Sequence, residues 1–494
     1  MVKMKDEALA AVREIPNWIG GAETAVASNT FIKKNPHDGT PIFRVARSGA
    51  GEVGQAVRAA KAAQGPWADL FVAKRGELLT ETALQLRKKR EEVARIVALE
   101  TGKSLKSALA ETDGAVSLGL FFGGEGQRYY GRTIASSIAH RQVFTVRQPI
   151  GVAGLIVPAN TPVANVAWKV FPALLCGNTA VLKAAEDAPG TAWLFARIAR
   201  EAGLPEGVLS VVQGLGDEAG AALVEHPDVG VLSFTGSAAT GRRVAVKAAE
   251  RFCRVSLELG GKNPLVVCDD ADLENAVSWT LLSAFGNAGQ RCSAASRILV
   301  FDKVYEVFRK NLVDRTRALR VGVSDADDLG PLIREDHLER VLSAVERAAN
   351  RGAKILTGGR RLTDSTHASG YYMEPTVMEN VDPRDEISVD ELFGPVTILY
   401  RVGNLEEAIA LSNDSPYGLT SAIHTQNLNR AHEYARRVQA GVVSINAGTY
   451  GSEPHLPFGG LKQSGNGTRE PGIEALDVYS ELKNVYVNVD SSKV

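Results

Sequence analysis

Cysteine is scarce in this chain, and charge of neither sign is in excess. The 494 residues include four cysteines, and no two of them have CxxC spacing. A disulfide framework or a structural metal site is therefore not expected, and we predict reduced thiols and no bound metal. Lys and Arg number 56 against 57 Asp and Glu, whereas proteins that bind nucleic acid usually carry a basic excess. Nucleic acid is excluded as an expected partner.

Long apolar runs are also missing. No segment reaches the roughly eighteen consecutive apolar residues that a membrane helix needs, so no membrane association is expected. Residues 1–20 mix charged residues with short apolar pieces, which is unlike the apolar core of a secretion signal. We therefore expect a cytoplasmic protein, long enough for roughly three domains.

What the sequence does contain is an alternation of short β-branched runs with helical patterns. A helical pattern at 191–202 ends at Gly203. Such alternation is typical of a doubly wound parallel sheet, the Rossmann-like form of the α/β class. The predicted strands are residues 151–157, 179–183, 207–213, 229–234 and 254–258.

A second alternating series indicates a second α/β lobe. It comprises the predicted strands 296–300, 396–400 and 441–445 and a predicted helix at 336–350.

Three further segments lie outside these two series. Apolar residues at helical spacing predict one surface-packed helix over 85–100, stopped by Gly102. Segments 130–148 and 482–489 look extended, and we predict that they can pair as strands.

Polar residues and glycines follow each predicted strand of the first sheet. Because ligands of doubly wound sheets bind at the carboxyl ends of the strands, we expect these residues to converge on one rim. In chain order they are Asn160, Lys183, Glu186, Gly214, Gly236, Ser237 and Glu258.

The turn at Gly236 and Ser237 is a candidate phosphate site. It closes a strand at Phe234 and opens a helix that continues past Gly241, so free N–H groups of the first helical turn could hold a pyrophosphate. An ordinary turn explains the same pattern equally well. The glycines around Gly214 are a weaker signal and fit a plain turn.

Lys183 and Glu186 indicate the cofactor. Lys183 could reach adenosine ribose or phosphate oxygens, although a lone surface lysine is the commoner case. Glu186 could accept both ribose hydroxyls and would repel the extra phosphate of NADP, with Asp187 adding to the repulsion. NAD is the predicted cofactor, and NADP stays open because a rotated Glu186 can admit that phosphate.

Cys292 is the candidate nucleophile. It lies in a small-residue loop, 286–293, which would let a substrate approach the thiol closely. The adjacent Arg291 could favour the reactive thiolate. An inert buried thiol is an equally good reading of Cys292 alone. That reading is preferred for the cysteines within or beside apolar stretches, Cys176, Cys253 and Cys268.

Glu258 and Asn160 supply the remaining catalytic chemistry. Glu258 is flanked by apolar residues at a strand end, where burial would raise its pKa to that of a general base. A structural ion pair is the alternative. Asn160 could donate its amide to an oxyanion, or could be an ordinary turn residue.

Four motifs together resemble those of the aldehyde dehydrogenase superfamily. They are residues 257–262 around Glu258, 289–293 around Cys292, 391–395 (Glu-Leu-Phe-Gly-Pro) and 457–465. The resemblance extends over about residues 35–489. It implies that Cys292 is the nucleophile, that Glu258 activates the deacylating water and that Asn160 holds the oxyanion.

The resemblance also implies a cofactor site, a domain layout and a homodimer or homotetramer. The cofactor residues are Lys183, Glu186, Gly214, Phe234, Gly236, Ser237, Gly241, Leu259, Glu391 and Phe393. The layout is a cofactor-binding domain (1–129 and 149–257), a catalytic domain (258–445), a small β oligomerisation arm (130–148 and 478–494) and a return segment (446–477) that lines the active site and packs on the cofactor domain.

The chain departs from the commonest family pattern in two places. Residues 158–162 (Pro-Ala-Asn-Thr-Pro) lack the Trp and Phe that usually flank the oxyanion Asn, and 183–186 read Lys-Ala-Ala-Glu where many members have Pro-Ser in the middle. Neither change removes a catalytic group. The first predicts a reshaped substrate side of the oxyanion loop, so no familiar substrate is carried over.

The predicted reaction oxidises an aldehyde to the acid with NAD(P)+ through a Cys292 thiohemiacetal and thioester. Three alternatives stay open. In an acylating dehydrogenase coenzyme A takes the acyl group, but such members generally lack the equivalent of Glu258. A thiol hydrolase or esterase would form the thioester without redox chemistry, and a non-catalytic binding protein would use none of these groups.

The predicted substrate is a polar or anionic semialdehyde. By resemblance, the pocket looks more polar than one for an aliphatic aldehyde, and Arg128, Arg291 or His455 could steer an anion, although each could instead be an ordinary surface charge. The predicted substrate-binding residues are Thr161, Asn165, Trp168, Arg128, Arg291, Ser293, His455 and Phe458, with Tyr450 and Ser452 in the same loop.

Overall fold

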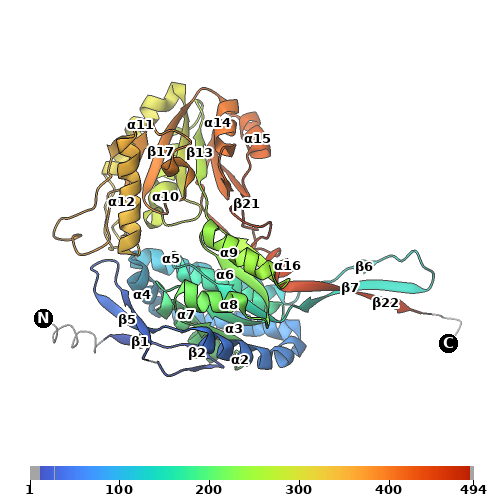
Figure 1. Ribbon diagram of the computed structural model, residues 1–494. Coiled ribbons are helices and arrows are strands. Elements are labelled where there is room, and N and C mark those ends of the chain that lie inside the picture. The colour runs from blue at the N-terminus through green and yellow to red at the C-terminus, as the bar shows by residue number, and fades with distance from the viewer. Residues whose placement is uncertain (1–11, 27, 490–494) are drawn as a thin grey trace.

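The computed structural model describes residues 12–26 and 28–489. Two lobes stand one above the other, and a narrow arm projects from the lower lobe (Figure 1). Part of the predicted amino-terminal pattern, 1–11, and the last residues of the predicted arm, 490–494, lie outside the described residues.

The lower lobe is built on a twisted, largely parallel sheet, as the alternation predicted. Its strands run in the order β12-β11-β8-β9-β10-β2-β3, with β2 antiparallel to β10. Their bounds are β2 Trp18–Ile19, β3 Ala22–Glu23, β8 Val152–Ile156, β9 Thr179–Lys183, β10 Leu209–Val212, β11 Val229–Thr235 and β12 Arg254–Glu258. The predicted α/β fold class is confirmed.

Helices cover both faces of this sheet, because alternate side chains of each strand point to opposite faces. Val181 packs in one cluster with α2, α8 and α9, whereas its neighbours Ala180 and Leu182 pack in another with α3 to α7 and α16. The helices are α2 Ala50–Asp69, α3 Val72–Lys88, α4 Arg90–Thr101, α5 Leu105–Glu125, α6 Pro162–Leu175, α7 Pro189–Glu201, α8 Ala221–Glu225, α9 Ala238–Ala249 and α16 Ala475–Tyr479, with η1 at Gly216–Gly220.

The single helix expected over 85–100 is wrong. The chain breaks at Lys89, which ends α3 and precedes α4. Leu86 and Val93 are both buried on either side of the break, so their helical spacing continues across it and conceals it. The predicted stop is correct, since Gly102 takes the left-handed conformation after α4.

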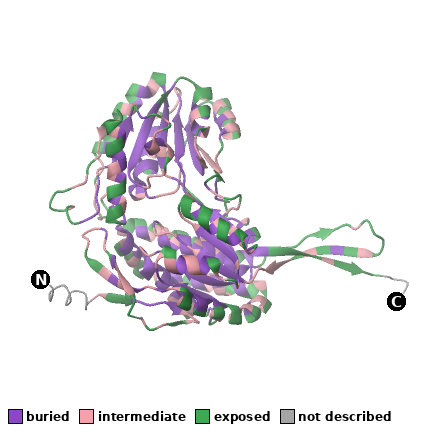
Figure 2. Ribbon diagram, viewed as in Figure 1, coloured by how far each residue is buried: buried purple, intermediate pink, exposed green. Residues whose placement is uncertain are grey.

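The upper lobe contains a second sheet, in the order β15-β16-β17-β14-β13-β19-β20. Its strands are β13 Asn263–Val267, β14 Ala295–Phe301, β15 Lys354–Thr357, β16 Thr376–Glu379, β17 Val396–Val402, β19 Thr420–His424 and β20 Val442–Ile445. Its helices are α10 Leu273–Phe285, α11 Asp302–Arg317, α12 Glu335–Asn350, α13 Glu386–Val389, α14 Leu405–Asn413 and α15 Leu428–Arg437, with η2 at Gly286–Gly289. Buried strands lie between these helices (Figure 2).

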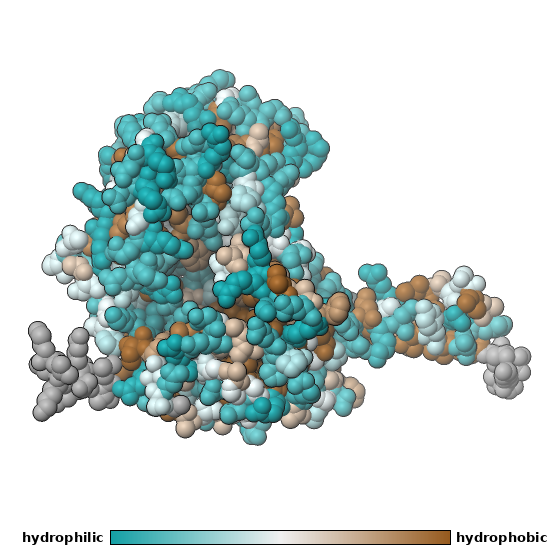
Figure 3. Space-filling view, in the orientation of Figure 1, coloured by the Kyte–Doolittle hydropathy of each residue, from teal (hydrophilic) through white to brown (hydrophobic). Residues whose placement is uncertain are grey.

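The arm is formed by the two extended segments that were expected to pair. β7 (Arg141–Pro149) and β22 (Ser480–Asn488) are antiparallel along their whole length, and β6 (Thr133–Ile134) pairs with β7. Most of the arm is exposed (Figure 2), and hydrophobic residues lie along it (Figure 3).

Two smaller sheets complete the described part of the chain. β1 (Arg13–Ile15), β4 (Thr30–Lys34) and β5 (Pro41–Ala46) form one, and β18 (Tyr417–Gly418) with β21 (Leu461–Lys462) forms the other. Among the described helices, none combines the length and apolarity that crossing a membrane requires.

Candidate active site

One large cavity gathers most of the predicted site residues. It has a volume of about 1040 Å³, the size of a pocket for a cofactor-sized ligand. The predicted residues that line it are Asn160, Thr161, Asn165, Trp168, Lys183, Glu186, Phe234, Gly236, Ser237, Glu258, Leu259, Arg291, Cys292, Ser293, Glu391, Phe393, Tyr450, Ser452 and Phe458. Four other predicted residues do not line it: Arg128, Gly214, Gly241 and His455.

The order of the strands explains this convergence. β8 and β11 are neighbours, but the chain continues from β8 to β9 on one side and from β11 to β12 on the other. The loops after β8 and β11 therefore diverge and leave a crevice at the carboxyl edge. Asn160 follows β8, and Gly236 follows β11.

The loop that carries Cys292 is held in an unusual conformation. Asn287, Ala288 and Gly289 all have positive φ angles. A Cβ on Gly289 would lie 2.2 Å from the Gly394 carbonyl oxygen, so glycine is required there. Beyond the loop, the Asn263 Nδ2 donates to the Cys292 carbonyl at 2.8 Å. These contacts fix the backbone around the thiol.

Gly260 and Gly261 let three chain segments meet beside the thiol. A Cβ on Gly260 would lie 2.1 Å from a Glu391 carboxylate oxygen, and one on Gly261 would lie 2.5 Å from the Cys292 carbonyl oxygen. The Gly261 N–H donates to Glu391 Oε1 at 3.1 Å. The two glycines thus bring Glu391 and Cys292 to the segment that follows Glu258.

The Cys292 thiol is protonated at neutral pH. Burial raises its pKa to about 12, with Glu391 and Glu258 adding to the effect. The pKa shift is opposite in direction to the one expected from Arg291, because burial of the thiol is the largest effect. The Arg291 guanidinium lies over the Tyr450 ring, 4.6 Å from its centroid.

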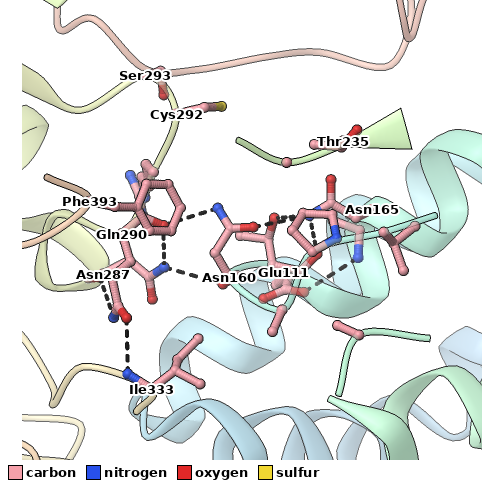
Figure 4. A pocket seen from close by; sticks show the side chains of 18 of the residues that line it. Glu111, Asn160, Asn165, Thr235, Asn287, Gln290, Cys292, Ser293, Ile333 and Phe393 are labelled. Carbon is pink, nitrogen blue, oxygen red and sulfur yellow. Dashed lines mark hydrogen bonds between the residues drawn. The ribbon is translucent and has the colours of Figure 1, made fainter. Parts of the chain in front are cut away.

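The Asn160 side chain is held in one orientation (Figure 4). Its Nδ2 donates to the Gln290 carbonyl at 3.0 Å, and its Oδ1 accepts from Asn165 Nδ2 at 3.3 Å. Asn165 also donates to the Thr161 hydroxyl at 2.8 Å. An amide NH₂ group has two hydrogens, so one Asn160 N–H is left for a ligand in the cavity.

Glu258 is the last residue of β12, and its side chain is 3 % exposed. Among the described residues, neither carboxylate oxygen of Glu258 has a hydrogen-bond partner. Burial raises its pKa well above 4.5, the nearby Glu470 adds to this, and Lys169 and Arg469 oppose it. This is the environment of a general base that works near neutral pH.

Lys183 and Glu186 form an ion pair at 2.7 Å on the cavity wall. Burial opposes ionisation of Glu186, but the charge of Lys183 outweighs it and lowers the pKa of Glu186. Asp187 lies within 4 Å of both Lys33 and Arg334, so these cations offset the repulsion expected from its charge.

The amino end of α9 fits a pyrophosphate. Ser237 caps the helix by accepting from the Thr240 N–H, but the N–H groups of the first helical turn are otherwise unpaired by the helix. The Gly236 N–H is already donated to the Glu258 carbonyl at 3.1 Å. The Thr235 hydroxyl, also on the cavity wall, is buried without a partner among the described residues.

Three glycines make room for neighbouring groups, and of these Gly236 also lines the cavity. A Cβ on Gly236 would lie 2.6 Å from the Phe234 ring, and one on Gly241 would lie 2.5 Å from the Leu259 side chain. Gly214 has a φ of +135° and closes a turn against Ser48. Phe234 and Leu259 reach the cavity because these positions are glycines.

Glu391 and Phe393 lie at the junction of the lobes. Burial raises the pKa of Glu391 to about 7, although its bond from the Gly261 N–H opposes the shift. Phe393 has a φ of +59°, and its carbonyl oxygen lies 2.8 Å from His337 Nε2.

The substrate side of the cavity is partly aromatic. The rings of Trp168 and Phe458 are 5.4 Å apart. Two of the cations expected to steer an anion lie elsewhere: Arg128 is exposed and paired with Glu125, and His455 is exposed near Glu453. Arg291 is the predicted cation that does line the cavity.

Sequence reasoning missed several residues of this site. Lys103, Glu111, Asn287 and Gln290 line the cavity, and the buried Lys169–Glu470 pair lies behind Glu258. Lys103 follows the helix-ending Gly102, but this local signal does not indicate what its ammonium contacts. No group of three or more His, Cys, Asp or Glu residues able to hold a metal occurs in the described ranges.

Comparison with known proteins gives one consistent answer. Residues 24–485 match the model of the aldehyde dehydrogenase family. The chain is 38% identical over 475 residues to the alpha-ketoglutaric semialdehyde dehydrogenase of Bacillus subtilis, covering 95% of this chain and 97% of that protein. It is 39% identical over 458 residues to the betaine aldehyde dehydrogenase of Brucella ovis, covering 92% and 93%.

A solved structure agrees with these sequence matches. The betaine aldehyde dehydrogenase of Staphylococcus aureus in complex with NAD+ has a TM-score of 0.94 and 34% sequence identity, over 98% of this chain and 97% of that one.

Proposed function

Because the chain belongs to the aldehyde dehydrogenase family, we propose that it oxidises its aldehyde at Cys292, with Asn160 as oxyanion donor and Glu258 as general base. The observation that carries this proposal is that all three residues line one cavity with the strand-end residues of the candidate cofactor site. A structural thiol and a structural carboxylate would have no reason to share that wall.

The coarser predictions are confirmed. The chain is an α/β enzyme of the aldehyde dehydrogenase family that oxidises an aldehyde to an acid with NAD(P)+, and NAD is the cofactor that the solved relatives support.

The cavity fits that cofactor. Lys183 and Glu186 would hold the adenosine ribose, the amino end of α9 would hold the pyrophosphate, and Glu391 would hold the nicotinamide ribose. When bound, NAD+ supplies the nicotinamide ring carbon that accepts a hydride from the substrate, and the cofactor then leaves as NADH.

The first chemical stage forms a bond to Cys292. Once the thiol has given its proton to water, the Sγ attacks the aldehyde carbon, and the carbonyl electron pair moves to oxygen. The free N–H of Asn160 and the backbone N–H of Cys292 stabilise that oxyanion. When the hydride has left, the oxyanion re-forms a carbonyl group and a thioester remains.

The second stage hydrolyses the thioester. Glu258 accepts a proton from water, the resulting hydroxide attacks the thioester carbon, and the carbon–sulfur bond breaks to release the acid and the Cys292 thiolate. The unpartnered oxygens of Glu258 support this role, because they are free to bind water. They also argue against a route that ends with transfer of the acyl group to coenzyme A.

For the substrate we propose a polar or anionic semialdehyde. Arg291 lines the cavity and stacks on Tyr450, and it forms no ion pair with a carboxylate among the described residues. A half-buried cation without a carboxylate partner favours an anionic ligand. Thr161, Asn165 and Ser293 would contribute polar contacts, and Trp168 with Phe458 the apolar wall.

The rest of the proposal concerns assembly. We keep the predicted domain layout as a proposal, with the arm as an oligomerisation element, because β7 and β22 project from the lobe with exposed apolar side chains. A homodimer or homotetramer follows. We place the enzyme in the cytoplasm, since the mechanism needs a reduced Cys292 thiol.

The test is an aldehyde panel, assayed with NAD+ and NADP+ by the absorbance of the reduced cofactor, for the wild type and Arg291→Ala. We expect oxidation with NAD+ preferred, and a higher kcat/KM for a semialdehyde carboxylate than for an uncharged aldehyde of similar length. Arg291→Ala is expected to reverse this ranking by raising KM for the anionic substrate alone.

Two results would contradict the proposal separately. Unchanged turnover by Cys292→Ser would reject the thioester mechanism. An unaltered substrate ranking in Arg291→Ala would reject the anionic substrate but leave the mechanism intact.

A further inference from the structure

Lys103 and Glu111 form a buried ion pair beside the loop that carries Asn160. Their side chains are 7 % and 6 % exposed, and the Lys103 Nζ lies 2.6 Å from Glu111 Oε2. Lys103 connects α4 to α5, and Glu111 belongs to α5. A buried pair of this kind is a weak source of stability, so its contacts indicate what else it does.

Lys103 holds the backbone of Asn160. Its Nζ donates to the Asn160 carbonyl oxygen at 2.9 Å. The Asn287 Nδ2, from the loop before Cys292, donates to the same oxygen at 3.2 Å. The peptide that follows the oxyanion donor is therefore fixed from two sides.

Glu111 holds the residues that come next. Its Oε1 accepts the Val163 N–H at 3.0 Å and the Ala164 N–H at 3.4 Å, which are in the first turn of α6. The N-cap residue Thr161 makes no side-chain cap of its own. Glu111 thus replaces the missing cap, and its negative charge suits the positive end of the helix.

The pair fixes both ends of the short segment from which the Asn160 amide projects. Figure 4 shows Asn160 between Gln290 and Asn165, with Glu111 on the α6 side. Asn165 lies one turn further along α6, and it orients the Asn160 amide by donating its Nδ2 to Asn160 Oδ1. A shift of this helix end would move both the Asn160 backbone and the side chain that orients its amide.

We propose that Lys103 and Glu111 are positioning residues that aim the Asn160 amide at the oxyanion. This inference rests on the proposed role of Asn160. The pair carries equal and opposite charges, so its own field at the substrate is small, and its effect on the reaction passes through Asn160. Oxyanion donors act only when they are held in place before the charge develops.

The test is a double-mutant cycle of Lys103→Met with Asn160→Ala. Single-turnover formation of NADH is measured by stopped flow, together with KM for the aldehyde and the Kd of NAD+. We expect Asn160→Ala and Lys103→Met each to slow NADH formation about 10- to 100-fold or more, with both binding constants little changed.

The decisive result is the double variant. If Lys103 acts through Asn160, adding Lys103→Met to Asn160→Ala slows the reaction less than about twofold further. If the two effects multiply, the proposal is overturned, because Lys103 then acts independently of Asn160. If Asn160→Ala alone leaves the rate unchanged, the proposed role of Asn160 fails instead, and the pair's role fails with it.

Two further variants keep the cycle interpretable. Lys106→Met removes an exposed lysine near the start of α5 and is expected to keep the wild-type rate. If Lys103→Met does not fold, Glu111→Gln takes its place in the double-mutant cycle. This variant removes the charge that pairs with Lys103, but the amide oxygen of the new side chain can still accept the N–H groups of α6. A KM that changes with substrate charge in Glu111→Gln would show that Glu111 acts on the substrate directly or through Arg291, and it would overturn the positioning role.

Discussion

Two carboxyl groups on the cavity wall, those of Glu391 and Glu258, act on the Cys292 thiol. Burial, Glu391 and Glu258 raise the pKa of the thiol to about 12, so the resting residue is a neutral thiol. Because thiolates are the oxidisable form, this environment protects Cys292 between turnovers.

Glu258→Gln separates the two chemical stages. We expect a first burst of NADH, because thioester formation does not need this base, followed by steady-state turnover slowed about 100-fold or more. Stopped-flow absorbance measures both phases, and the exposed Glu274→Gln is the matched control. A normal steady-state rate in Glu258→Gln would remove Glu258 from deacylation.

The pH dependence of wild-type turnover is also expected to reflect Glu258. A base acts when ionised, and burial raises the pKa of Glu258 well above 4.5. Deacylation-limited turnover is therefore expected to rise with pH through the raised pKa and to be lost as the pH falls below it. Glu258→Gln is expected to lack this limb, and an identical limb in the variant would assign it to another group.

Among the elements, α6 joins the oxyanion loop to the return segment. Lys169 of α6 pairs with Glu470 at 3.0 Å, both side chains being 0 % exposed. The Ser233 hydroxyl on β11 donates to Glu470 at 2.9 Å. One buried pair thus ties the helix, the sheet and the return segment together behind Glu258.

Lys169→Met is expected to destabilise the protein by about 3–5 kcal/mol, because it leaves the Glu470 carboxylate buried without its cation. Adding Glu470→Gln is expected to recover part of the loss, since the uncompensated charge disappears. Urea denaturation followed by fluorescence measures both. Lys74→Met, which breaks an exposed pair with Glu77, is expected to have little effect, and an equal loss there would contradict the explanation.

On the scale of the whole molecule, the arm is the element least explained by the single chain. Leu482 and Tyr486 lie on β22 with exposed fractions of 58 % and 60 %. Exposure of these apolar side chains to water is unfavourable. Contact with a second copy of the chain would bury them.

Leu482→Asp/Tyr486→Asp is therefore expected to lower the mass measured by light scattering after gel filtration, because two buried charges would disfavour association. Asn488→Asp adds one charge at a polar position of the same strand and is expected to keep the wild-type mass. An unchanged mass in the double variant at equal concentration would show that the arm does not hold the subunits together.

The sequence by itself determined the fold class and the residues at the centre of the cavity, because most of the predicted site residues line it. Strand and helix periodicity depends on local geometry, so β9 and β12 occupy the predicted ranges. The glycines beside Glu258 and before Cys292 allow close contacts that a Cβ would prevent. Because only glycine fits at these positions, the motifs that contain them can be recognised in a single sequence.

Only the tertiary structure decided which charges meet. The Lys103–Glu111 pair, the cations that offset Asp187 and the stacking of Arg291 on Tyr450 join residues with no common sequence pattern. The break at Lys89 keeps the helical spacing on both sides, so periodicity could not reveal it. Local sterics act between neighbours along the chain, whereas ion pairs and oxyanion geometry depend on distances that only the packed sheets and helices set.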